Sequence, residues 1–277
     1  MELEHIVAQL AREVERRYYG KYRGFVVDND DPEQLGRLKL TVPSVLGDAV
    51  VTGWAMPCVP YGGAEGQGLL MVPDVDAGVW VEFEEGDLEF PIWVGTFWSK
   101  PGGTPELPVP HDADGEPGDA QSPPTRKIIR TAAGHTIQFE DADDEVRVIL
   151  SDGQNENRIV LGQSALTVTN KDNSVTMDDS GIVIADANGN TVTHSSSGVT
   201  IEDANGNQIE MAAAGIKVGS SSASEPFVLG LQFTTEVASF LTSLATHTHV
   251  GNMGAPTSPP TSPINLTVPT SSKHFTE

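Results

Sequence analysis

Residues 180–190 read Ser-Gly-Ile-Val-Ile-Ala-Asp-Ala-Asn-Gly-Asn, and residues 197–207 repeat them as Ser-Gly-Val-Thr-Ile-Glu-Asp-Ala-Asn-Gly-Asn. The register is 17 residues, and a third copy begins at Gly215. Each unit holds two short alternating strands joined by an Asp-Ala-Asn-Gly-Asn turn. A unit this small cannot bury its apolar side alone, so it must stack on its neighbours or on other chains. The repeat therefore predicts a rod of β-structure with a mechanical role.

The β pattern of the repeat extends over residues 127–224, where short alternating segments are separated by Asp, Asn and Gly turns. The clean repeat at 181–219 is the regular end of this series. Alternation gives each strand one apolar and one polar face. Several chains wound together would place the Ile/Val face on a shared axis and leave Thr, Asn and Asp outside. We expect their strands to share backbone hydrogen bonds between chains.

The composition restricts the classes of partner. The chain has 277 residues and a net charge of -23, from 39 acidic and 16 basic residues. This charge argues against nucleic acid as a partner, because binding phosphates requires a basic surface. The acidity is explained by solubility, with adaptation to a salty host as the alternative. The single cysteine, Cys58, excludes an intrachain disulfide.

The sequence contains no targeting signal. It has no run of about 18 apolar residues, and residues 1–5 lack the basic and apolar regions of a signal peptide. We therefore expect assembly in the cytoplasm. Contact with a membrane would require delivery by another component.

The chain before the repeats divides into three segments. Residues 1–21 contain an amphipathic helix over 2–19, with apolar residues at helical spacing. Residues 22–98 alternate as short strands near 24–27, 36–42, 51–56, 68–72, 78–83 and 91–95, and this pattern suits a Greek-key barrel of the OB type. Residues 99–126 are rich in Pro, Gly and acidic residues, and their composition predicts a semi-extended linker.

The C-terminal segment, residues 225–277, changes character. Val237, Phe240, Leu241 and Leu244 form one helical stripe, and Thr234 or Thr235 could cap the start of that helix. From Gly251 the tail is rich in Pro, Ser and Thr and lacks a core. The predicted fold is therefore mainly β, with an N-terminal helix, an OB barrel, a needle, a short C-terminal helix and a tail.

Residues 24–98 resemble the OB domain of contractile-tail spike proteins. This family includes phage baseplate assembly protein V, the VgrG spikes of type VI secretion and the spikes of extracellular contractile injection systems. The matching segments, in chain order, are Gly24-Phe25-Val26-Val27-Asp28-Asn29, Asp31-Pro32, Leu35-Gly36-Arg37-Leu38-Lys39-Leu40, Trp54-Ala55, Pro60-Tyr61-Gly62-Gly63, Pro73, Gly78-Val79-Trp80-Val81-Glu82-Phe83-Glu84-Glu85-Gly86-Asp87 and Pro91-Ile92-Trp93-Val94-Gly95. Each segment is short, but the ordered series is specific.

This resemblance implies a homotrimer at the tip of a tube, with barrels as a collar and three chains intertwined as a β-helical or β-prism needle. The needle would pierce the target envelope when a sheath contracts. A separate hub or baseplate protein would hold the barrels, the inner tube would connect indirectly, and a PAAR-like tip protein or an effector could cap the C-terminal end. Some phage members of the resembled family carry a lysozyme domain between collar and needle. Because residues 99–126 leave no room for such a domain, we expect no enzyme.

Thr246-His247-Thr248-His249 is the best candidate for a metal site. In an extended segment, His247 and His249 point to the same side. Three chains would bring six nitrogens to a threefold axis, an octahedral set compatible with iron or another first-row metal. Spike tips of the resembled family hold iron on a His-x-His pair of this kind. The alternative, two polar loop histidines without metal, stays open.

Other functional patterns are weaker. Residues 28–31 and the Asp186 and Asp203 turns resemble calcium loops in composition, but their spacing fits ordinary turns. His135 and His194 are expected in strands and facing solvent. The alternatives to a spike are a carbohydrate-binding or adhesin-like OB module on a β-stalk, and a polysaccharide lyase or hydrolase. No Gly-x-Ser-x-Gly elbow, Walker loop or zinc spacing occurs in the sequence.

Overall fold

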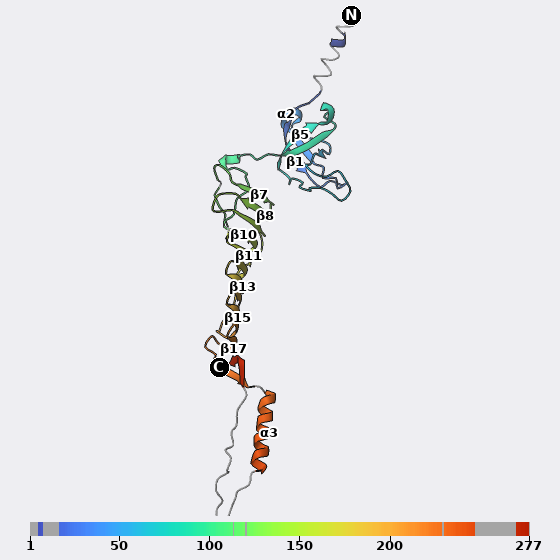
Figure 1. The fold of residues 1–277 in the computed structure, drawn as a ribbon. Coiled ribbons are helices and arrows are strands. Elements are labelled where there is room, and N and C mark those ends of the chain that lie inside the picture. Colours follow the sequence, from blue (N-terminus) through green and yellow to red (C-terminus); the bar gives the residue numbers. More distant parts are fainter. Residues whose placement is uncertain are drawn as a thin grey trace, which may run out of the picture. The chain divides into compact units, whose positions relative to one another are not determined.

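The computed structural model describes residues 5–7, 17–112, 114–119, 121–228, 230–246 and 270–276. It divides into two compact units, Met1–Leu107 and Pro108–Glu277 (Figure 1). The structure is mainly β, as expected, and the first unit contains a six-stranded sheet.

The first unit is a small sheet that closes on itself. Its strands are β1 (Tyr22–Asp28), β2 (Lys39–Val42), β3 (Gly47–Val51), β4 (Met56–Pro57), β5 (Gly78–Phe83) and β6 (Pro91–Thr96), in the order β3-β2-β1-β5-β6-β4. A single helical turn, α2 (Pro43–Leu46), joins β2 to β3. Leu38, just before β2, exchanges two backbone hydrogen bonds with Ala55, just before β4. This pairing closes the barrel and confirms the OB-type architecture.

The barrel core follows the period of two. Alternate residues of β5 are buried, and the predicted inward set Leu38, Leu40 and Val42 is fully buried. The remaining buried hydrophobic residues of this core are Val26, Ala55, Val79, Val81, Phe83 and Trp93. Gly24 is required where β1 meets β5, because a Cβ there would lie 2.8 Å from Val81 Cγ2 and 2.9 Å from the Thr41 carbonyl oxygen.

Two of the expected strands are wrong. Residues 68–72 belong to the long loop between β4 and β5, where Leu70 is 84 % exposed. Gly63 and Gly66, both with positive φ, turn this loop and keep its apolar run out of the sheet. The expected strand 51–56 is interrupted, since β3 ends at Val51 and β4 begins at Met56.

The N-terminal helix is described only at residues 5–7, which are helical; residues 1–4 and 8–16 lie outside the described part. The expected end of the helix near residue 19 is wrong. Residues 17–19 are not helical, because the Tyr18 N–H donates to the Gly86 carbonyl at 2.9 Å. The Tyr18 ring also packs edge-on against Phe83.

The second unit is an antiparallel ribbon in which each strand from β7 to β17 pairs with the next along the chain (Figure 1). Its strands are β7 (Arg126–Arg130), β8 (Thr136–Glu140), β9 (Arg147–Ser151), β10 (Asn157–Leu161), β11 (Ala165–Asn170), β12 (Asn173–Asp178), β13 (Gly181–Ala185), β14 (Thr191–Ser195), β15 (Gly198–Glu202), β16 (Gln208–Ala212) and β17 (Gly215–Gly219). β19 (Thr270–Thr276) joins β17 in parallel and pairs with β18 (Glu225–Val228).

The C-terminal helix α3 spans Gly230–Thr246, which confirms the predicted helix and extends its start. Thr234 and Thr235 therefore do not cap it. Their hydroxyl groups donate within the helix to the carbonyls of Gly230 and Leu231, at 2.8–3.0 Å. The strand β19, which the sequence pattern did not predict, adds β-structure to the tail at residues 270–276.

Residues 108–126 form part of the second unit, although their composition predicts a spacer. The His111 N–H donates to Gln138 Oε1 at 2.9 Å, and Gln138 Nε2 donates back to the His111 carbonyl at 2.6 Å. Gln138 and Glu140 of β8 are buried beneath this segment. The spacer character is thus confined to the earlier residues, because polar side chains of β8 bind the later ones.

Candidate assembly interface

One face of the ribbon carries two parallel ladders of apolar side chains. Cross-strand pairing places the members of the first ladder opposite one another from strand to strand: Ile129, Ile137, Leu150, Ile159, Val168, Val175, Ile184, Val192, Ile201, Ile209 and Val218. The second ladder contains Phe139, Val148, Leu161, Leu166, Met177, Ile182, His194, Val199, Met211 and Ile216, after Lys127 at its start. We call this surface the ladder face.

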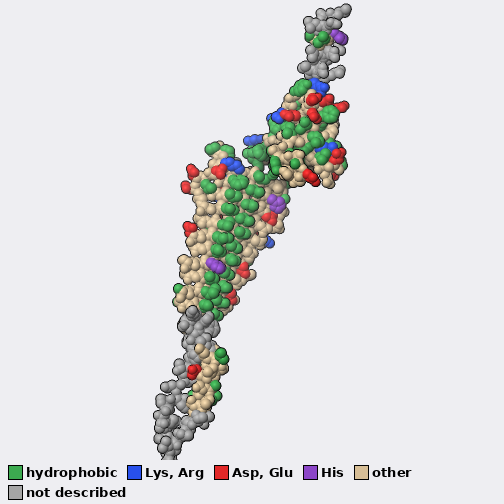
Figure 2. Space-filling model, turned by 45° about the vertical axis from the view of Figure 1, so that its right-hand side comes forward, with side chains coloured by type: hydrophobic (Ala, Val, Ile, Leu, Met, Phe, Trp, Pro, Cys, Tyr) green, Lys and Arg blue, Asp and Glu red, His purple; other side chains and the backbone are tan. Residues whose placement is uncertain are grey.

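The ladder face is open to solvent in the single chain. Ile129 is 47 % exposed, and Ile182, near the middle, is 37 % exposed. Figure 2 shows the hydrophobic side chains gathered in a stripe along the ribbon. An exposed apolar surface of this extent marks an interaction site. The single chain therefore leaves the apolar side of its repeats unburied, as the repeat analysis predicts.

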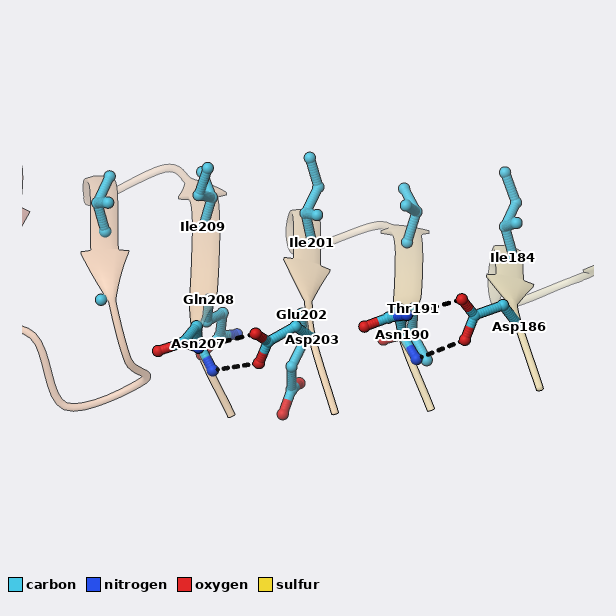
Figure 3. A pocket seen from close by; sticks show the side chains of 13 residues that line it. Ile184, Asp186, Asn190, Thr191, Ile201, Glu202, Asp203, Asn207, Gln208 and Ile209 are labelled. Atoms are coloured by element: carbon cyan, nitrogen blue, oxygen red, sulfur yellow. Dashed lines mark hydrogen bonds between the residues drawn. The ribbon is translucent and has the colours of Figure 1, made fainter. Parts of the chain in front are cut away.

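A groove of about 560 Å³ runs along part of the ladder face. Ile184, Ile201 and Ile209 line it from three different strands, and their side chains project in the same direction (Figure 3). The polar edge of the groove is formed by the Asp186 and Asp203 turns. Such a groove can accept apolar side chains of a second ribbon.

The opposite face of the ribbon is not equivalent. Near β8–β10 it is a core, with Gln138 and Ile149 fully buried and Val160 buried. Near β15–β17 it is polar, where Glu210 pairs with Lys217 at 3.1 Å. The ladder face alone is both apolar and uncovered along β7–β17, so it is the face suited to association.

Backbone pairing in the ribbon takes place within one chain. Each strand from β8 to β16 is hydrogen-bonded on both sides to its sequence neighbours. The expected sharing of backbone hydrogen bonds between chains is therefore replaced, in these strands, by intrachain ladders. Association through this surface depends on side-chain packing of the ladder face, because the backbone groups of the strands already have partners.

The repeat turns are held by their own aspartates. Asp203 Oδ1 accepts the N–H groups of Asn205 and Asn207, both at 2.9 Å, and Oδ2 accepts from Asn207 Nδ2 at 2.7 Å. Asp186 makes the same bonds with Asn188 and Asn190. Figure 3 shows those with Asn190. Hydrogen bonds from Asn207 and Asn190 lower the pKa of each aspartate to about 2. The turns need no cation, because amide donors satisfy the carboxylates.

Neighbouring turns are also linked to one another. Asn190 Oδ1 accepts the Ala204 N–H at 3.2 Å, and Asn173 Oδ1 accepts the Ala187 N–H at 3.1 Å. These asparagine side chains thus connect neighbouring turns along the ribbon, as the backbone hydrogen bonds connect neighbouring strands.

Asp203→Ala should lower the melting temperature of the second unit, since it removes the carboxylate that accepts hydrogen bonds from Asn205 and Asn207. Adding calcium or EDTA to the wild-type chain should leave that temperature unchanged. Differential scanning calorimetry measures both effects. A calcium-dependent rise that Asp203→Ala abolishes would contradict this account of the turn.

In the barrel, the acidic turn after β1 is also held by hydrogen bonds to an aspartate. Buried Asp31 accepts Arg37 Nη2 at 2.6 Å and the Leu35 N–H at 2.8 Å. The Arg37 hydrogen bond holds the pKa of Asp31 well below its usual range. The Arg37 guanidinium lies 5.7 Å from the centre of the Trp54 ring. This Asp31–Arg37 pairing accounts for the turn without calcium.

The four tryptophans of the barrel occupy different environments. Trp93 is buried in the core and donates to the Gly36 carbonyl at 3.1 Å. Trp80 packs against Phe97 at 5.3 Å between ring centres, beneath the Arg23 guanidinium. Trp98 is exposed. Packing in the core and at the surface accounts for the positions of these tryptophan rings. The rings do not form a row of exposed faces on which nucleic-acid bases could stack.

The predicted metal ligands His247 and His249 lie outside the described residues. His194 is exposed in β14, as expected, whereas His135 is exposed just before β8. Within the described ranges, no three His, Cys, Asp or Glu side chains of one chain gather as a metal-binding group. The helices that the structure describes include none long and apolar enough to cross a bilayer.

Two family models match the chain at the places where the barrel and the ribbon lie. Residues 22–98 match the type VI secretion system/phage-baseplate injector OB domain. Residues 166–222 match the phage baseplate V C-terminal trimerisation domain. Both matched domains are those of the contractile-tail spike family. No curated protein matches it.

The second match indicates that the ladder face serves in trimerisation. The trimerisation model covers Leu166 to Ser222, which includes the regular part of both ladders. Its description supports a homotrimer. The first match confirms the OB assignment of the barrel, and the two together place the chain among structural components of phage baseplates and injection machines.

A buried polar junction on the other face of β8 was not predictable from the sequence. Glu140 accepts Gln121 Nε2 at 3.2 Å, Thr125 Oγ1 at 2.6 Å and the Ala142 N–H at 3.0 Å, and it pairs with Arg126. Burial alone would raise the pKa of Glu140, but these hydrogen bonds lower it to about 2. The alternation of β8 marks which residues share this face, but no sequence signal indicates that they are covered.

Proposed function

We propose that three copies of this chain form the spike at the tip of a contractile tail or injection tube. The observation that carries the proposal is the ladder face, which is open in one chain and coincides with the matched trimerisation domain. Three such faces directed at a common axis would bury their ladders against one another. Burial of apolar surface is the dominant favourable term in association of this kind.

The proposed mechanism is mechanical. Each ribbon resists stretching because its successive strands are paired by backbone hydrogen bonds. Packing three ribbons around a dry core would resist bending, since bending would separate apolar side chains that fit closely. When a sheath contracts, such a rod transmits the load to its end. We propose that this load drives the spike through the target envelope, a structural rather than a catalytic action.

We propose a different partner for each end of the chain. A hub or baseplate protein would hold the barrel end, and the inner tube would be reached through it. The C-terminal end would bind a PAAR-like tip protein or an effector, a proposal supported by the exposed Leu231, Leu241 and Leu244 of α3. His247 and His249 remain a proposed iron site on the axis. The net charge of -23 gives no support to nucleic acid as a partner.

Electron microscopy of assembled particles tests the proposal. A compact tag fused after Glu277 should appear at the end of the tube, with three copies of the chain per particle by quantitative mass spectrometry. A tag inserted in the barrel loop at Gly63 serves as the matched control and should appear at the baseplate. A chain that is absent from the particles, or distributed along the tube, would contradict the proposal.

A further inference from the structure

His194 interrupts an otherwise apolar surface. From β8 to β17 the described members of the two ladders are aliphatic, aromatic and methionine side chains, with His194 as the one polar member. Its cross-strand neighbours are Ile182 on β13 and Val199 on β15. On its own strand, Val192 lies on the same face.

The trimer proposed above would move this imidazole from water into the packed interior, and the inference rests on that proposal. A buried ring nitrogen needs a hydrogen-bond partner or a ligand. The ladder positions around His194 supply none, because Ile182, Val199 and Val192 are hydrocarbon. The polar groups that symmetry would bring to the same level are the two other copies of His194.

We propose that three His194 side chains, one from each chain, form a binding site for a divalent transition-metal ion inside the spike. Neutral imidazole nitrogen is a strong ligand for such ions, and three histidines with a water in the fourth position are an established coordination set. Each chain contributes a single ligand, so the site is incomplete without its partner copies. This agrees with the absence of a metal-binding group within the described part of one chain.

The proposed site is separate from His247 and His249. His194 is in β14, inside the segment that matches the trimerisation domain, whereas the His247/His249 pair follows α3. A metal at His194 would cross-link three ribbons in the middle of the regular repeats. It would therefore stabilise the trimer against dissociation without being needed at the tip.

The test uses the full chain carrying His247→Ala/His249→Ala, which we call the background protein. In this protein, His247 and His249 cannot contribute to the zinc that is measured. This background and the same chain with His194→Val are incubated with Zn²⁺, freed of excess metal and analysed for zinc and for mass by light scattering. Valine suits the site, because its neighbours are aliphatic and its β-propensity is high. We expect one zinc per trimer in the background and at least a tenfold loss in the His194→Val chain.

Cobalt gives a second readout. Co²⁺ should produce visible absorption bands of a low-coordinate nitrogen site in the background protein, and these bands should disappear with His194→Val. Zinc should also raise the dissociation temperature only when His194 is present. If the background protein is a trimer without zinc, or if zinc is retained after His194→Val, the proposed metal site is wrong. The proposed trimeric spike is unaffected by either result. A monomer in both samples overturns the metal site together with the proposed spike.

Discussion

Chains carrying Ile201→Lys are expected to fail to form the trimer. Ile201 belongs to the first ladder, between Val192 and Ile209, and lines the groove on the ladder face. Three copies of the substitution would place three ammonium groups in an apolar interior, at a cost on the order of several kcal/mol for each. Light scattering should then report monomers or soluble aggregates in place of a uniform trimer.

The matched control is the same change at the adjacent residue. Thr200 points to the opposite face of β15 and lies across from Glu210. Thr200→Lys therefore adds a surface charge near a carboxylate, and its effect on assembly should be within about 0.5 kcal/mol. If Ile201→Lys assembles as well as Thr200→Lys does, the ladder face is not the interface.

Glu140→Ala is expected to cause the largest loss of local stability in the second unit. The side chain is fully buried and pairs with Arg126, which is itself 14 % exposed. Removing one partner of a buried ion pair costs about 3–5 kcal/mol, because the remaining charge has no partner. Peptides covering 108–151 should exchange their amide hydrogens at least about a hundredfold faster.

Asp141 offers a control one residue away. It pairs with Lys127 at the surface, where both side chains are more than half exposed. Asp141→Ala should change the exchange rates of the same peptides by less than about threefold, since exposed pairs contribute little. Equal effects of the Asp141 and Glu140 substitutions would show that the buried junction is not the source of the stability.

The same carboxylate gives the junction a pH dependence. The pKa of Glu140 is lowered from 4.5 to about 2 in the folded chain. A lowered folded pKa contributes stability that is present above the ordinary pKa and is lost as pH falls toward the folded value. Wild-type protection of 108–151 should thus exceed that of Glu140→Gln at pH 6, and the difference should shrink between about pH 4.5 and 2. A difference that grows on acidification would reverse the sign and contradict this assignment.

The strands whose residues alternate between apolar and polar, or that belong to the 17-residue repeat, were predictable from the sequence. β5 has the predicted bounds, and the strands of the clean repeat, β13 to β17, follow the register of Gly181, Gly198 and Gly215. Their alternation also identifies which side chains share the ladder face. That the face stays open in one chain follows from the small size of the unit, which supplies no second layer to cover it.

Long-range contacts account for what the sequence could not predict. Leu69, Leu70 and Met71 read as a strand, yet no neighbouring strand pairs with them in the described barrel, and the glycines before them turn the loop away. Glu140 and Gln138 are polar residues of an alternating strand, and they are buried because Gln121 and His111, 19 and 27 residues earlier, bind them. Composition indicated a spacer there because it records charge and proline content and not these pairings.

The mass of the full chain in solution tests the central claim most directly. Size exclusion with light scattering, over a range of micromolar concentrations, should give three times the 29.4 kDa of one chain. That result would show that the open ladder face is covered by two further copies. A stable, monodisperse species of 29.4 kDa would contradict it, because the apolar ladders would then remain exposed in the native protein.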